Sequence, residues 1–192
     1  MGEEINKKSR LEIFKYNAIL SALFFLTSTF YLGSKIPNYN LSKYTISQMS
    51  FFLNDNQLPF FNLIFIIKCL LDLSFTYYVF KKYQLKLNTI TSLIWLMAVL
   101  SFGLLGFFPV SKFKIVHWII TGCIFLFFTI SQHVFAKLTK HKGFEYFSNN
   151  LIVIQFLVVF LFFSFSKING IFEIIYFLLV FIWQLIFISR FL

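Results

Sequence analysis

Long apolar runs separated by short polar segments dominate this sequence of 192 residues. A helix that crosses a lipid bilayer needs about 20 mostly apolar residues, because each residue adds about 1.5 Å along the helix axis. Six runs approach this length and are bounded by Lys, Pro, Asn or Gly: 14–32, 58–80, 89–108, 115–135, 151–165 and 171–191. The fifth run is the shortest. The pattern predicts an all-α fold, a polytopic membrane bundle of six transmembrane helices.

The composition supports a location in lipid. Hydrophobic residues make up 59% of the chain, charged residues only 12%, and the mean hydropathy is +0.81. A soluble domain of this length would have too few polar residues to cover its core, whereas in a bilayer the apolar side chains can face acyl chains. We therefore expect a single integral membrane domain over residues 1–192.

The basic residues predict how the bundle is oriented, because cytoplasmic loops of membrane proteins carry an excess of Lys and Arg. Eleven such residues lie on one side of the six runs: Lys7, Lys8, Arg10, Lys15, Lys81, Lys82, Lys86, Lys137, Lys140, Lys142 and Arg190. Five lie on the other: Lys35, Lys43, Lys112, Lys114 and Lys167. We expect both termini on the cytoplasmic side of the cell membrane (N-in/C-in). The net charge of +10 then reflects topology and not a nucleic-acid partner.

The longest segment between two runs, residues 33–57, is expected on the outer face. It is too short to form a domain of its own. Its part 44–53 is amphiphilic enough to lie as a short helix in the lipid headgroup region. The alternative is an ordinary connector that closes the bundle, and the sequence does not distinguish the two.

Two charged residues lie near the middle of the second run. Each of Lys68 and Asp72 alone would cost at least about 2.5 kcal/mol to insert into a bilayer. Their i, i+4 spacing places them on one helix face, so we expect them to pair in the bundle interior, in a polar stripe with Asn62 and Thr76. We interpret this stripe as a proton, ion or headgroup site. The alternative is a neutral structural pair that fixes the helix register.

Two further titratable residues, His117 and Glu173, lie near the outer ends of the fourth and sixth runs. We expect His117 within hydrogen-bonding reach, directly or through one water, of Glu173 or of Ser47 and Gln48 in the outer loop. Such a cluster could bind a polar headgroup or assist acid and base steps. The alternative is that each side chain extends to the membrane surface.

Residues that hold cofactors are scarce. His117 and His133 are sixteen residues, or about 24 Å, apart on one predicted helix, and no second helix offers a histidine at either level for haem. The spacing of a zinc site and the motifs of nucleophilic or phosphate-binding enzymes do not occur. We expect no cofactor and no metal, and whether the protein is an enzyme stays open. The buried amides Gln132, Gln155 and Gln184 are expected to bond across helices.

Two segments of the chain resemble a known family. The first is Pro37-Asn38-Tyr39 together with the loop sequence YTISQM at 44–49, and the second is GLLGFFP at 103–109, followed by His117. This layout is similar to the uncharacterised six-helix membrane family called domain of unknown function 998. That family pairs a P-x-Y and I-S-E-L-G-like loop with a G-x-F-P turn and a following His.

The resemblance has consequences for the outer mouth of the bundle. It implies that Ser47, Gln48, Pro109 and His117 gather there, near Glu173. Gln48 stands where the family has an acid, and that puts an acid-base role at this position in doubt. The family brings no established activity.

The sequence favours a small membrane component that binds a membrane lipid or another membrane protein, because its polar groups are few and no reaction motif appears. One alternative is a small proton- or ion-coupled transporter that uses Lys68 and Asp72. A second is a membrane enzyme that acts on a lipid headgroup through His117 and Glu173.

Labelling from the two faces of the membrane tests the predicted topology. Cysteines introduced at Ser42 and at Thr139 are expected to react with a membrane-impermeant reagent from opposite faces, because one lies in the outer loop and the other in a cytoplasmic connection. Reaction of both positions from the same face would contradict an even number of spans with the N-terminus inside.

Overall fold

The computed structural model of the chain describes residues 12–165 and 168–192. Four of the basic residues in the topology prediction, Lys7, Lys8, Arg10 and Lys167, lie outside these ranges.

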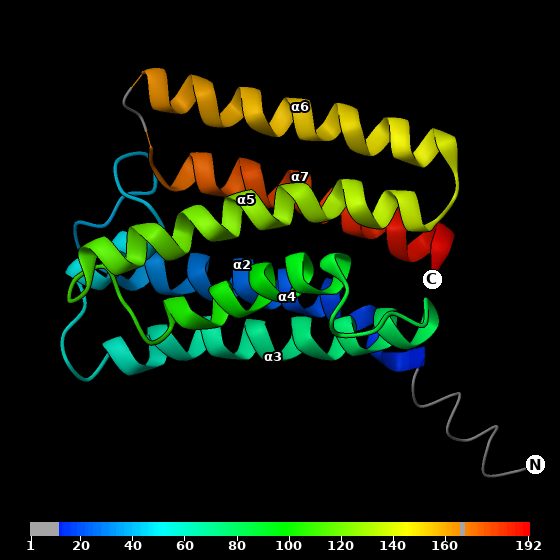
Figure 1. The fold of residues 1–192 in the computed structure, drawn as a ribbon. Helices are drawn as coiled ribbons and strands as arrows, with labels where there is room; N and C mark the ends of the chain where they lie inside the picture. The colour runs from blue at the N-terminus through cyan, green and yellow to red at the C-terminus, as the bar shows by residue number, and fades with distance from the viewer. Residues whose placement is uncertain (1–11, 166–167) are drawn as a thin grey trace, which may run out of the picture.

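Six helices lie side by side in a bundle (Figure 1). Their bounds are α2 Asn17–Lys35, α3 Leu58–Lys82, α4 Ile90–Leu105, α5 Lys114–Leu138, α6 Lys142–Ser164 and α7 Gly170–Phe191. Two short 3-10 helices add to them, η1 Phe14–Tyr16 and η2 Ser47–Phe51. All regular structure in the described residues is helical, so the predicted all-α fold is confirmed.

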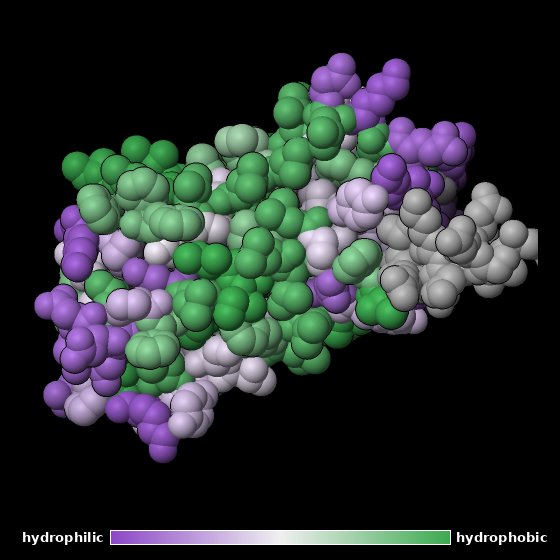
Figure 2. Space-filling model, turned by 90° about the horizontal axis from the view of Figure 1, so that it is seen from below, coloured by the Kyte–Doolittle hydropathy of each residue, from purple (hydrophilic) through white to green (hydrophobic). Residues whose placement is uncertain are grey.

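Five of the helices are long and apolar enough to cross a membrane: Phe14–Lys35, Leu58–Lys82, Lys114–Leu138, Lys142–Ser164 and Gly170–Phe191. The remaining helix, α4, has 16 residues and is the shortest of the six. Hydrophobic residues form a band along the molecule, and hydrophilic residues gather at its two ends (Figure 2). A band of this kind suits a surface that faces acyl chains between two wet ends.

The prediction that the fifth span is the shortest is wrong. Helix α6 has 23 residues and begins at Lys142, whereas the apolar run begins at 151. The additional turns are helical because the ring of His141 caps them, with Nδ1 accepting from the Phe144 N–H at 3.1 Å. Their buried positions, Phe144 and Ser148, recur every fourth residue rather than in a continuous run.

Aromatic rings join the helices in the centre of the bundle. The ring of Phe25 on α2 packs edge-on against Phe65 on α3, Phe102 on α4 and Phe177 on α7, with centroid distances of 5.6, 5.1 and 5.6 Å. Edge-to-face pairs of this kind contribute about 0.5–1.5 kcal/mol each beyond the area that they bury. One phenylalanine therefore ties four helices together.

The two ends of the bundle differ. At the end that we call the loop end, residues 36–57 fold over the helices, and Met49 in η2 is fully buried. Because the loop is buried against the helices in this way, it is a connector that closes the bundle. At the opposite end, the C-terminal end, α7 finishes beside the start of the described chain: Lys82 donates to the Leu192 carbonyl at 2.5 Å, and Tyr78 donates to Glu12 at 3.2 Å.

Two glycines provide a matched test of the packing. A Cβ on Gly106, at the end of α4, would lie 2.7 Å from the backbone oxygen of Asn62 on α3, whereas a Cβ on Gly122 in α5 would meet nothing within 4 Å. We expect Gly106→Ala to cost about 1–3 kcal/mol of stability by overpacking. Gly122→Ala should instead add about 0.5–1 kcal/mol, because alanine is the better helix former. Thermal unfolding in detergent measures both, and equal shifts would contradict the close approach of α3 and α4.

Candidate functional site

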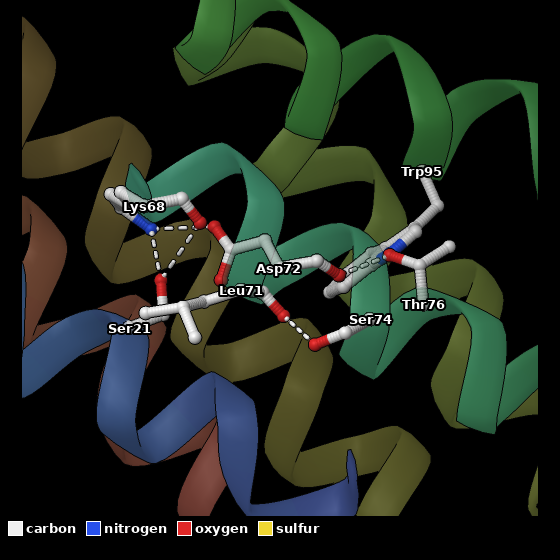
Figure 3. A network of polar contacts seen from close by, with 7 residues as sticks. All are labelled: Ser21, Lys68, Leu71, Asp72, Ser74, Thr76 and Trp95. Carbon is white, nitrogen blue, oxygen red and sulfur yellow. Dashed lines mark hydrogen bonds and ion pairs between the residues drawn. The ribbon is translucent and has the colours of Figure 1, made fainter. Parts of the chain in front are cut away.

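The centre of the candidate site is an ion pair on α3. Lys68 Nζ lies 2.6 Å from Asp72 Oδ2, one helical turn away, and both residues are buried, with 8% and 2% of their surface exposed (Figure 3). The ammonium also donates to Ser21 Oγ on α2 at 3.3 Å and lies 4.4 Å from the ring centre of Phe102 on α4. The predicted pairing in the bundle interior is thus confirmed.

The polar stripe on α3 continues from the pair in one direction only. Thr76 donates to the Asp72 carbonyl at 2.6 Å and accepts from Trp95 Nε1 on α4 at 2.6 Å, so its hydroxyl is fully engaged (Figure 3). Asn62 lies about 9 Å from Lys68 along the helix. Its buried Oδ1 has no hydrogen-bond partner among the described residues. The structure therefore joins Thr76 to the pair but not Asn62.

A small cavity of about 30 Å³ opens beside the ammonium. Lys68 and Gln184 supply its polar lining, and the remaining walls are largely aromatic: Phe25, Phe102, Phe128 and Phe177. A water molecule needs about 10–15 Å³ of such space, so the cavity accommodates one or two waters and no lipid headgroup. Gln132 bonds to Gln155 across helices at 3.2 Å as expected, whereas Gln184 faces this cavity, which its sequence position did not indicate.

At the loop end, the first turn of α7 holds the loop. Glu173 Oε2 accepts from the Ile46 N–H at 2.5 Å, and Asn169 Nδ2 donates to the Ser42 carbonyl at 2.8 Å. Gly170 donates its N–H to the Tyr44 carbonyl at 2.9 Å, and a Cβ at this position would lie 3.0 Å from that oxygen. Only glycine allows the loop to come this close, and the carboxyl group of Glu173 is buried beneath it.

His117 does not meet Glu173. Its buried ring donates from Nδ1 to the carbonyl of Phe108 at 2.7 Å, and this contact fixes the tautomer because a carbonyl can only accept. In the described parts of the chain, no hydrogen bond links His117 to Glu173, Ser47 or Gln48. The prediction of a direct contact is therefore wrong, since the ring donates its Nδ1–H to the carbonyl just before Pro109 instead.

Ser47 and Gln48 serve the loop's own structure. Gln48 Oε1 accepts from the Thr45 N–H at 2.9 Å, which closes the turn that begins η2. Ser47 and Glu173 line a second cavity, of about 20 Å³, whose walls include Phe25, Phe102 and Phe177. The neighbouring loop residue Tyr39 donates to the Thr45 carbonyl at 3.1 Å. Burial, and then the nearby carboxylate of Glu173, raises the pKa of the Tyr39 phenol.

Metal ligands do not come together in the described residues: no group of three or more His, Cys, Asp or Glu residues lies close enough to hold an ion. Buried ionisable residues lie at different depths among the described residues. The Lys68–Asp72 pair lies in the middle of the bundle, and Glu173 and His117 lie toward the loop end.

Removing one partner of the ion pair should destabilise the bundle more than removing both. Asp72→Leu leaves the Lys68 ammonium buried and uncompensated, at an expected cost of about 3–5 kcal/mol, whereas the double change to Leu at both positions should recover most of this loss. Thermal unfolding in detergent measures the difference. Asp55→Leu is the control, because that carboxylate is 97% exposed and its pair with Lys112 spans 4.0 Å. An Asp72→Leu variant as stable as the parent would contradict the role of the pair.

Comparison with known proteins identifies the family. A family model described as "Protein of unknown function (DUF998)" matches residues 19–190, from the start of α2 to the last turn of α7. No curated protein and no solved structure matches the chain. The family that the 37–49 and 103–117 segments indicated is thereby confirmed, and with five helices able to span a membrane this chain is a polytopic membrane protein of the DUF998 family.

Proposed function

We propose that the protein crosses the cytoplasmic membrane with six helices and both termini inside, and that its interior exchanges protons as part of a proton-coupled transport function. The charge distribution supports the orientation. The C-terminal end carries eight described basic residues: Lys15, Lys81, Lys82, Lys86, Lys137, Lys140, Lys142 and Arg190. The loop end carries four: Lys35, Lys43, Lys112 and Lys114. Both described chain ends also lie at the C-terminal end.

The observation that carries the proposal is the Lys68–Asp72 pair beside a cavity of water size. A proton that reaches Asp72 removes the charge that compensates Lys68. The ammonium must then release its own proton or find another partner, because an unpaired charge is costly in an apolar interior. Its other contacts, Ser21 on α2 and Phe102 on α4, would have to change as well. Protonation is thereby coupled to the packing of three helices.

Glu173 supplies a second ionisable group for the proposed proton exchange. The cavity beside it and the cavity beside Lys68 share the rings of Phe25, Phe102 and Phe177. Along α7, Glu173 precedes the residues that line the Lys68 cavity by about 6–16 Å of helix rise. The ion pair and Glu173 thus lie at successive depths, each beside a water-sized cavity, and the two cavities share a layer of rings. This arrangement suits stepwise proton transfer with a barrier in the middle.

A membrane component that binds a lipid or another membrane protein is the second candidate. Its support is helix α6, which packs mainly against α5 and α7 and presents large apolar side chains outward, among them Phe156, Phe160 and Phe163. The loop end gives this candidate less support, because the 20 Å³ cavity there is too small for a headgroup. A headgroup enzyme has the least support, since His117 and Glu173 bond to different backbone groups.

Proton uptake by reconstituted vesicles tests the proposal. With a pH-sensitive dye inside and a potassium diffusion potential imposed by valinomycin, vesicles that contain the parent protein should acidify faster than protein-free vesicles. Asp72→Asn and Glu173→Gln should each reduce uptake to the protein-free rate, because each removes a proton acceptor. Glu145→Gln is the matched control, since this carboxyl group lies on α6 and lines neither interior cavity.

Infrared difference spectroscopy of the same vesicles separates proton exchange from a purely structural pair. Acidification should produce carboxyl bands that Asp72→Asn and Glu173→Gln each remove in part. If neither variant changes the acid-induced spectrum, the interior carboxyl groups do not exchange protons and the proposal is wrong. If the bands are present but parent vesicles take up protons no faster than protein-free ones, the transport function is excluded.

A further inference from the structure

A wide hollow next to charged groups lies at the C-terminal end, between the start of α6 and the end of α7. This groove has a volume of about 570 Å³, many times that of either interior cavity. Its lining residues are His141, Gly143, Phe144, Phe147, Ile186, Arg190 and Phe191. None of these belongs to the sites that the sequence predicts.

The rim of the groove carries unused hydrogen-bond donors. Arg190 lies exposed in the last turn of α7 and takes part in none of the salt bridges of the described residues. His141 Nδ1 accepts from the Phe144 N–H at 3.1 Å, so in the neutral ring the proton is on Nε2, which is then a free donor. Lys140 and Lys142 flank His141 in the chain. The rim therefore favours an anion.

The floor of the groove is aromatic and apolar. The Phe144 ring lies 4.6 Å from that of Phe191 and 6.1 Å from that of Phe147. Ile186 lies one helical turn before Arg190 on α7, which places it about 6 Å closer to the middle of the bundle. The groove is thus polar at the end of the molecule and apolar toward the hydrophobic band, which is the order of groups along a phospholipid.

We propose that this groove binds an anionic phospholipid, with the phosphate at Arg190 and His141 and the acyl chains over Phe147 and Ile186. The guanidinium group of Arg190 can hold two phosphate oxygens at once, and Nε2 of His141 can donate to a third acceptor. Basic pockets between spanning helices bind anionic headgroups in this way. The site is independent of the Lys68–Asp72 pair and needs no proton exchange.

Lipid retention on the purified protein tests the site. The full chain in a neutral detergent is titrated with phosphatidylglycerol or with phosphatidylcholine, and bound lipid is counted by native mass spectrometry. We expect phosphatidylglycerol to bind more tightly, and Arg190→Ala to weaken its binding about tenfold, because a bidentate charge-assisted contact is lost. Ile186→Trp should also weaken it, since the larger side chain fills the apolar part of the groove.

Lys86→Ala is the matched control, because this exposed lysine lies at the same end of the bundle and outside the groove. It should change binding less than twofold, and unfolding temperatures without lipid verify that all variants are folded. Equal losses for Arg190→Ala and Lys86→Ala would show that general surface charge attracts the lipid and would overturn the proposal. Equal binding of phosphatidylcholine, or no effect of Ile186→Trp, would overturn it as well.

Discussion

Two opposite charges that cannot leave an apolar bundle constrain the arrangement of its helices. Lys68 and Asp72 neutralise each other at 2.6 Å, but an ammonium group has three donors and the carboxylate satisfies only part of them. Ser21 from α2 and the ring of Phe102 from α4 supply the remaining contacts. The contacts of the ammonium thus come from three helices, so the pair is tied to their packing as well as to the balance of charge.

Aromatic rings bound the water-sized spaces that lie beside these charges. The ring of Phe25 meets those of Phe102 and Phe177 edge to face. The cavities beside Lys68 and Glu173 are bounded by these same rings. Aromatic packing thus holds the helices together beside spaces that have room for water but not for a larger molecule, and this arrangement suits the proton exchange that we propose.

The sequence predicted those features that follow from local periodicity. Apolar runs located all six helices, and the i, i+4 spacing of Lys68 and Asp72 with the cost of inserting charges predicted their pair. The sequence could not predict which backbone group a buried polar side chain binds. The Ile46 N–H that binds Glu173 and the Phe108 carbonyl that binds His117 have no residue signature. The sequence also did not predict the early start of α6. Its first turns depend on the His141 cap and on buried positions four residues apart, and not on a continuous apolar run.

The ends of the bundle differ in how their polar side chains are used, and this difference decides where a ligand can bind. At the loop end, Asn169 and Glu173 bond to backbone groups of the loop, so the loop is held closed over a space of water size. At the C-terminal end, Arg190 and the free nitrogen of His141 border a wide groove and have no such partners in the described chain. Binding at the loop end must first break internal hydrogen bonds, whereas binding at the C-terminal end adds new ones. The groove at the C-terminal end therefore has the space for the lipid that we propose there, whereas the interior cavities have room only for water.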